Sequence, residues 1–121
     1  MKKILVVDDK SSISALLVQF LSQQYLVETK ADGLEALAYL QQGNIPDMII
    51  TDLQMPNMDG LELIQSLKES GYFKDIPIIV LSSKDSSADR VQCLKLGAED
   101  YIIKPFNPEE LLLRIEKVLL R

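Results

Sequence analysis

Side chains that could ligate a metal or transfer a group stand directly after four short apolar runs of the sequence. Asp8 and Asp9 follow the first run, and Asp52 lies just beyond the third. Ser82 follows the fourth run and Lys104 the fifth. The chain contains no histidine, which excludes the Ser-His-Asp and Cys-His nucleophilic machineries and most zinc sites. Any chemistry must therefore use carboxylates, hydroxyls, lysines and a hard metal ion.

Three carboxylates brought to one place would repel each other and raise their pKa values unless a cation offset the charge. Mg²⁺ suits such oxygen ligands, whereas no loop offers the dense ligand series of a calcium-binding EF-hand. A lysine beside the metal becomes useful when an anion also enters. Phosphate is the anion whose charge calls for both a metal ion and an ammonium group. Each residue singly also fits an ordinary role as a helix cap or turn residue. Together they favour phosphoryl transfer to a carboxylate.

The apolar runs themselves predict five strands. They cover residues 4–7, 25–27, 48–50, 78–81 and 101–103. Most of these runs are continuously apolar, as expected of strands that are covered on both faces. Because helical segments separate them, we expect βαβ units and a mainly parallel sheet with helices on both faces. The carboxyl ends of the strands would then share one edge, where open α/β sheets bind ligands.

Start and stop signals predict five helices between and after these strands. The starts are Ser11-Ser12, Asp32 with Glu35, Asp59-Gly60, Asp85-Ser86 and Asn107-Pro108, and the stops include Gly43-Asn44, Gly71 and Gly97. Asp32 followed by Glu35 predicts a reciprocal capping box. Asn107 and Pro108 predict a cap residue followed by a first-turn proline. These signals leave the order of the strands open.

Length, charge and cysteine content limit the class of protein. The 121 residues suit one domain, which we expect to span 1–121. The net charge of −5 comes without a basic cluster, so nucleic acid and membrane surfaces are poor direct partners. No apolar run approaches the roughly 20 residues of a membrane span, and the first run meets Asp8 too early for an export signal. The single Cys93 excludes an internal disulfide and favours a reducing, cytoplasmic location.

Several ordered motifs, each at a predicted strand end, resemble one protein family. They are Val6-Val7-Asp8-Asp9, Asp52-Leu53-Gln54-Met55-Pro56, Met58-Asp59-Gly60, Ser82 and Lys104-Pro105-Phe106. Over essentially the whole chain, this pattern resembles the CheY-like receiver domain of bacterial two-component response regulators. The resemblance implies an α/β, doubly wound (βα)5 three-layer sandwich of the flavodoxin-like type. Its five-stranded parallel sheet would have the order 2-1-3-4-5, with two helices on one face and three on the other.

The resemblance also implies a phosphoacceptor and a metal site. Asp52 would attack the phosphohistidine of a sensor histidine kinase or phosphotransfer protein and form an acyl phosphate. Mg²⁺ would be held by Asp9, Asp52 and the backbone carbonyl of Gln54, with Asp8 assisting through water. The chain would then be a signalling domain in phosphorelay signal transduction and not an enzyme in its own right.

Three further residues match the switch of that family. Ser82 would hydrogen-bond the new phosphoryl group, and Lys104 would make a charge-assisted contact to one of its oxygens. Tyr101 matches the aromatic residue that turns inward when Ser82 moves, and an ordinary half-buried strand tyrosine is the alternative interpretation. Phosphorylation would change the surface formed by the helix after Ser82, the Tyr101 strand and the final helix. That surface would control an output domain or partner.

Four charged residues fall where receivers of winged-helix transcription regulators pair symmetrically on activation. They are Arg90, Asp100, Glu110 and Arg114. The resemblance implies a possible homodimer through the surface described above. An ordinary solvated charged face is an equally good interpretation, since isolated surface pairs are weak.

Three rival functions remain open. A phosphatase that forms an aspartyl phosphate also needs a strand-end aspartate, Mg²⁺ and a lysine, but it usually has a second acid where Gln54 stands. A flavin-binding doubly wound protein would need a Gly/Ser/Thr-rich phosphate loop where Asp8 and Asp9 stand. A degenerate receiver that acts as a phosphorylation-independent interaction module is disfavoured because every expected site residue is present.

Overall fold

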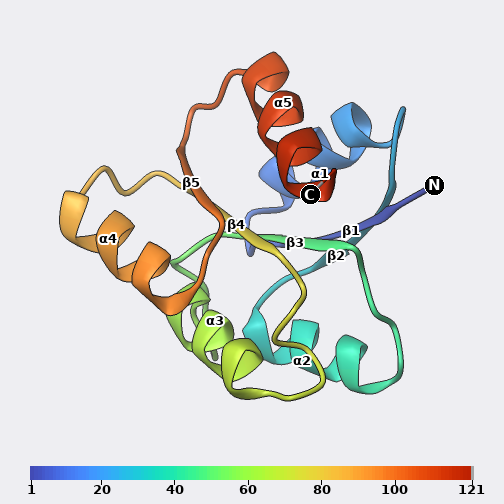
Figure 1. Cartoon of the computed structure of the whole chain (residues 1–121). Coiled ribbons are helices and arrows are strands. Elements are labelled where there is room, and N and C mark those ends of the chain that lie inside the picture. The colour runs from blue at the N-terminus through green and yellow to red at the C-terminus, as the bar shows by residue number, and fades with distance from the viewer. Residues whose placement is uncertain (121) are drawn as a thin grey trace.

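Five strands alternate with five helices along the chain (Figure 1). The computed structural model describes residues 1–120. In chain order the elements are β1 (Lys3–Val7), α1 (Ser11–Leu21), β2 (Leu26–Lys30), α2 (Gly33–Gln41), β3 (Met48–Thr51), α3 (Gly60–Glu69), β4 (Ile78–Ser82), α4 (Ser87–Leu96), β5 (Asp100–Ile103) and α5 (Pro108–Leu119).

The strands form one parallel sheet in the order β2-β1-β3-β4-β5. The predicted α/β class, the doubly wound architecture and the 2-1-3-4-5 order are therefore confirmed. The central strand is β3, which pairs with β1 on one side and with β4 on the other. Asp52 follows directly after β3, so it lies in the middle of the edge at which all five strands end.

The sheet separates two hydrophobic cores. Residues of α2, α3 and α4 pack on one face with alternate strand residues such as Leu5, Ile49 and Val80. Residues of α1 and α5 pack on the other face with Ile4 and Ile50. Figure 1 shows the same division, with α1 and α5 above the sheet and the other three helices below it. This is the predicted arrangement of two helices against three.

The second strand differs from its prediction. The structure starts β2 at Leu26 and extends it through three polar residues to Lys30, whereas the apolar run predicted 25–27. The reason is that β2 is an edge strand, which pairs only with β1 and is partly exposed along its length. An edge strand needs no continuous apolar sequence, because its ladder to one neighbour is enough to hold it.

The predicted helix starts are largely confirmed, with one correction. Asp32 caps α2 by accepting from the Glu35 N–H at 3.0 Å, but Glu35 returns its side chain to the Ala31 N–H and not to Asp32. The reciprocal capping box predicted there is therefore incomplete. A complete box occurs at α3, between Asp59 and Glu62. Gly97 ends α4 in a left-handed conformation with φ 114°, as its position predicted.

The two ends of the described chain lie near each other. Lys2, which precedes β1, lines the same hollow as Val118 and Leu119 at the end of α5. The other lining residues include Asp47 and Pro77, which precede β3 and β4. This hollow therefore lies at the edge where the strands begin, opposite the edge that carries Asp52. None of the helices within residues 1–120 combines the length and the apolar character that crossing a membrane requires.

Candidate functional site

The residues predicted from the strand ends converge at the carboxyl edge of the sheet. The ladder continues one step beyond two strands, because Asp8 N–H donates to the Lys30 carbonyl and Asp52 N–H to the Val7 carbonyl, both at 3.0 Å. These backbone bonds hold Asp8 and Asp52 on neighbouring strands at the same height. Both side chains are buried, with 5% and 4% of their residue surface exposed.

Asp8, Asp9 and Asp52 form an acidic cluster. Each can offer one carboxylate oxygen such that the three oxygens lie within 4.8 Å of one another. Three convergent carboxylate oxygens suit a hard divalent cation, which prefers oxygen ligands and offsets their mutual repulsion. The residues present therefore fit the predicted metal site, and the cluster is the group expected from the sequence.

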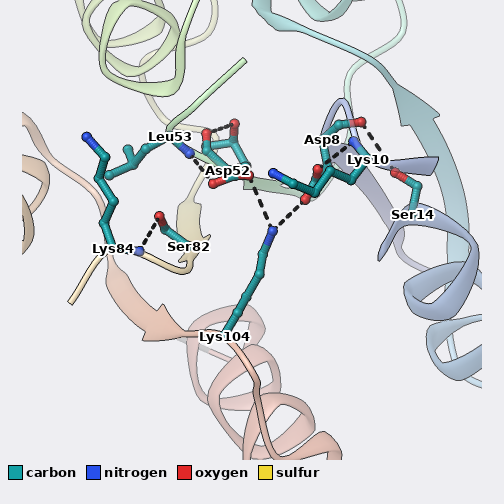
Figure 2. A network of polar contacts seen from close by, with 9 residues as sticks. Asp8, Lys10, Ser14, Asp52, Leu53, Ser82, Lys84 and Lys104 are labelled. Carbon is teal, nitrogen blue, oxygen red and sulfur yellow. Dashed lines mark hydrogen bonds and ion pairs between the residues drawn. The ribbon is translucent and has the colours of Figure 1, made fainter. Parts of the chain in front are cut away.

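Lys104 joins two members of this cluster (Figure 2). Its Nζ donates to Asp8 Oδ2 at 2.9 Å and to Asp52 Oδ2 at 3.3 Å. Its side chain is only 11% exposed, so both contacts are shielded from bulk water. The lysine predicted to contact a phosphoryl oxygen thus pairs with two of the carboxylates and offsets part of their charge.

The two adjacent aspartates are bonded differently. Asp8 uses both carboxylate oxygens, because Oδ1 accepts from the Lys10 N–H at 2.9 Å and Oδ2 accepts from Lys104. Asp9 is exposed, and its carboxylate has no hydrogen bond within residues 1–120. Asp9 is therefore available to bind a metal directly, whereas Asp8 is already engaged on both oxygens.

The loop after β3 opens beside the cluster. Asp52 Oδ1 accepts from the N–H of Leu53 at 2.6 Å, which turns the carboxylate toward its own loop. Gln54 is exposed in this loop and, with Asp9 and Lys84, lines an open pocket of about 520 Å³. This pocket gives an approach from solvent to the side of the cluster on which Asp9 lies.

Ser82 and Tyr101 meet through the backbone of Lys84. The buried Ser82 hydroxyl accepts from the Lys84 N–H at 3.2 Å (Figure 2), while the Tyr101 hydroxyl donates to the Lys84 carbonyl at 2.8 Å. Tyr101 is 8% exposed, and this burial raises the pKa of its hydroxyl. The two predicted switch residues thus both bond the backbone of Lys84 in the β4–α4 loop, Ser82 at its N–H and Tyr101 at its carbonyl, with Tyr101 already turned inward. Sequence reasoning missed this backbone role of Lys84.

Three of the four predicted interface residues pair within the chain. Arg114 Nη1 contacts both Asp100 oxygens, at 3.0 and 2.8 Å, and Arg114 Nη2 contacts Glu110 at 2.8 Å. The Asp100 and Glu110 carboxylates, in that order, hold the pKa of the guanidinium above its usual value. Arg90 lies apart from them on α4, and it has no ion pair among the described residues.

Sequence reasoning did not connect two further residues, Asp32 and Asn57, with the loop beside the site. Asp32, predicted only as a helix cap, also accepts from Asn57 Nδ2 at 2.7 Å. Asn57 belongs to the loop that begins at Leu53, and it has a positive φ of 66°. An asparagine between a proline and a helix start is a turn signal, but its partner lies 25 residues away and could not be read from the sequence.

Comparisons with known proteins agree with this fold. The model of the response regulator receiver domain family matches residues 4–116. The probable transcriptional regulator ycf27 of Guillardia theta is 44% identical over 99% of this chain, which covers 46% of that protein. The transcriptional regulatory protein ResD of Bacillus subtilis is 42% identical over 98% of this chain, which covers 48% of it. The chain thus spans about half the length of these curated relatives.

Solved structures give the same result over nearly whole chains. The chemotaxis response regulator CheY4 of Vibrio cholerae superposes with a TM-score of 0.89 at 39% identity, covering 98% of each chain. A putative response regulator from Chloroflexus aurantiacus has a TM-score of 0.93 at 32% identity, covering 99% of this chain and 98% of its own. With the parallel sheet, the strand-end carboxylates and the family match in agreement, this chain belongs to the response regulator receiver domain family of two-component systems.

Proposed function

We propose that this domain accepts a phosphoryl group on Asp52 from the phosphohistidine of a sensor histidine kinase or a phosphotransfer protein. The observation that carries the proposal is the position of Asp52. It is the residue that follows the central strand, its carboxylate is buried, and it lies beside two further aspartates and the ammonium of Lys104. Receiver family membership supplies the donor class, since these domains act in phosphorelays.

The proposed reaction is a transfer between two nucleophiles. An Asp52 oxygen attacks phosphorus, an O–P bond forms, and the P–N bond to the donor imidazole breaks. The bond's electron pair returns to the imidazole nitrogen, and the product is an acyl phosphate on Asp52. Lys104 can turn from the two carboxylates to a phosphoryl oxygen, which would leave its charge paired throughout.

Mg²⁺ is the proposed cofactor, and this chain offers a ligand set for it. Asp9 and Asp52 would provide carboxylate oxygens and Gln54 its backbone carbonyl, with Asp8 reached through water. The exposed, unbonded carboxylate of Asp9 supports its role as a direct ligand. When bound, the metal offsets the charge of the carboxylates and of the incoming phosphoryl group.

The proposed readout is a change at the surface formed by α4, β5 and α5. The Ser82 oxygen accepts from the Lys84 N–H, and the Lys84 carbonyl accepts from Tyr101, so a phosphoryl group on Asp52 would offer the Ser82 hydroxyl a charged acceptor for its own proton. Rearrangement of the Lys84 backbone would move the start of α4. This surface is also the proposed homodimer interface, which exposed Val91, Leu94 and Leu113 support.

The alternative of an aspartyl-phosphate phosphatase is less well supported. Such an enzyme needs a second acid close after the nucleophile, and the exposed Gln54 stands there. A module that no longer takes phosphate is disfavoured because Asp52, Lys104 and the acidic cluster are all brought together.

The test is chemical phosphorylation of the purified domain with acetyl phosphate, with and without Mg²⁺, followed by intact-mass spectrometry. We expect one added phosphoryl group that depends on Mg²⁺ and is absent from the Asp52→Asn variant. The control is Asp75→Asn, which changes an exposed aspartate at the opposite edge of the molecule and should react like the wild type. Sedimentation of the same samples tests the homodimer, which predicts a larger species only after phosphorylation.

Two outcomes would contradict the proposal. An adduct that persists in Asp52→Asn would assign the acceptor to another residue. A folded wild-type domain that gains no phosphoryl group with either acetyl phosphate or phosphoramidate would be a module that works without phosphate.

A further inference from the structure

The N-terminus of α2 is tied to the loop that carries the proposed metal ligand. Asp32 uses its two carboxylate oxygens for two different elements. Oδ1 caps α2 by accepting from the Glu35 N–H at 3.0 Å, and Oδ2 accepts from Asn57 Nδ2 at 2.7 Å. The Asn57 hydrogen bond, followed by the helix cap, holds the pKa of Asp32 below its usual range, so its carboxylate remains charged. A charged acceptor makes both bonds stronger than neutral ones.

A second contact lies beside the first. The Gly33 N–H donates to the Met58 carbonyl at 3.1 Å. The approach is so close that a Cβ on Gly33 would meet Met58 Cγ at 2.6 Å. Together the Asp32–Asn57 and Gly33–Met58 contacts form what we call the α2 clamp. It holds two successive loop residues against the start of a helix that lies far away in the sequence.

The loop within the clamp has a constrained shape. The Met58 N–H donates to the Pro56 carbonyl at 2.7 Å, which closes a tight turn around Asn57, where φ is 66°. At the far end, the Gly60 N–H donates to the Leu53 carbonyl at 2.9 Å. Gln54 therefore stands in a short segment between a fixed start at Leu53 and the clamped turn. Positive φ is uncommon outside glycine and persists where surrounding contacts enforce it.

We propose that Asp32 and Asn57 are positioning residues that hold the loop so that the Gln54 carbonyl faces the acidic cluster before any metal arrives. This proposal rests on the proposed metal site. Without the clamp, the loop samples other conformations, and metal binding must then bear the cost of ordering it. The clamp acts on the metal site from outside it, because neither residue belongs to the cluster of Asp8, Asp9 and Asp52.

The experiment removes the Asp32–Asn57 hydrogen bond and keeps the local backbone conformation and the helix cap. Asn57→Gly removes the amide but tolerates positive φ. Asp32→Ser keeps a good cap residue for α2 and removes the second acceptor. The control is Asn44→Ala, which removes another part-buried asparagine bond, from Nδ2 to the Tyr39 carbonyl at 2.9 Å, at the opposite end of α2.

Mg²⁺ affinity is measured by calorimetry, and hydrogen exchange of residues 53–59 is measured in the metal-free protein. We expect Asn57→Gly and Asp32→Ser each to weaken Mg²⁺ binding about tenfold, the range found when partners of metal ligands are removed. Exchange of the loop should speed up in both. The double variant should be no worse than either single one, because both remove the same bond. Asn44→Ala should keep wild-type Mg²⁺ affinity.

Unchanged Mg²⁺ affinity in both clamp variants, with normal binding in the wild type, would overturn the clamp and leave the phosphoacceptor proposal intact. Equal weakening in Asn44→Ala would also overturn it, since the effect would then come from general loss of stability. Failure of the wild type to bind Mg²⁺ would refute the proposed metal site and the clamp with it. At saturating Mg²⁺, the clamp variants should still be phosphorylated on Asp52.

Discussion

Lys104 is the residue on which the charge balance of the site depends. Its ammonium lies between Asp8 and Asp52, and together with them it leaves a single net negative charge where the carboxylates alone would leave two. A divalent cation that enters the cluster must approach this ammonium. The lysine therefore opposes metal binding in the resting state and favours the arrival of an anion.

Replacing Lys104 by methionine separates these two effects. We expect Lys104→Met to bind Mg²⁺ more tightly, by roughly tenfold or about 1.4 kcal/mol, because a nearby positive charge is removed from a shielded site. Phosphorylation by acetyl phosphate should become slower at saturating Mg²⁺, because a contact to the phosphoryl oxygens is lost. Calorimetry and timed mass spectra measure the two quantities.

Lys10→Met is the matched control, because Lys10 is an exposed lysine next to the same aspartates. Lys10→Met should change the Mg²⁺ affinity less than Lys104→Met does, since exposed charges are screened by water and salt. Weaker Mg²⁺ binding by Lys104→Met would mean that the lysine organises the carboxylates more than it repels the metal.

Residue types and strand ends were sufficient to predict which side chains gather at the site. The same reasoning could not separate Asp8 from Asp9, because two adjacent aspartates look alike in a sequence. Their difference arises from the Lys10 N–H and from Lys104, which together occupy Asp8 and leave Asp9 exposed. It also could not find Asn57 as the partner of Asp32, since that contact requires the fold.

At the scale of elements, α3 begins against the backbone of the site. A Cβ on Gly60 would lie closer to the Asp52 carbonyl oxygen than any real contact, and at 2.8 Å from Leu53 Cα. Backbone atoms cannot move aside as the end of a flexible side chain can. Gly60 therefore lets the first turn of α3 lie directly on the strand end that presents Asp52.

Gly60→Ala should therefore destabilise the domain by at least about 2 kcal/mol, the usual scale of overpacking in a closely packed region. Gly71→Ala is the control, because nothing lies within 4 Å of its added Cβ. It should change the unfolding free energy by no more than about 0.5 kcal/mol. Urea unfolding of both variants measures the difference, and similar stabilities would show that α3 can shift without cost.

Helix starts were easier to predict than strand limits for a physical reason. A cap depends on a few adjacent residues, such as Asn107 before Pro108, and those residues are visible in the sequence. The limits of β2 depend on its neighbour β1, whose ladder carries the strand through polar residues to Lys30. The misassigned capping box at Asp32 has a similar origin, because the turn before α2 directs Glu35 to the Ala31 N–H.

At the scale of the whole molecule, one parallel sheet places four chain segments at a common edge. Helical and apolar periodicity predicted the α/β class and the layers, and the two separate cores agree with that prediction. The order of the strands came from the family resemblance, because apolar runs of similar length carry no information about their neighbours. The order matters, since it puts β3 between β1 and β4 and thus Asp52 at the centre of the edge.

The hollow shared by Lys2, Val118 and Leu119 brings the two ends of the described chain together on the side away from the acidic cluster. A short glycine-serine linker could therefore join these ends, and the chain could then begin at another loop without a change in the fold. A circular permutant that starts at Asn44, after the exposed Gly43, would retain every strand and helix intact. We expect it to show the far-ultraviolet circular dichroism and the Mg²⁺ affinity of the original chain, and loss of either would mean that the original chain order is itself needed to build the site.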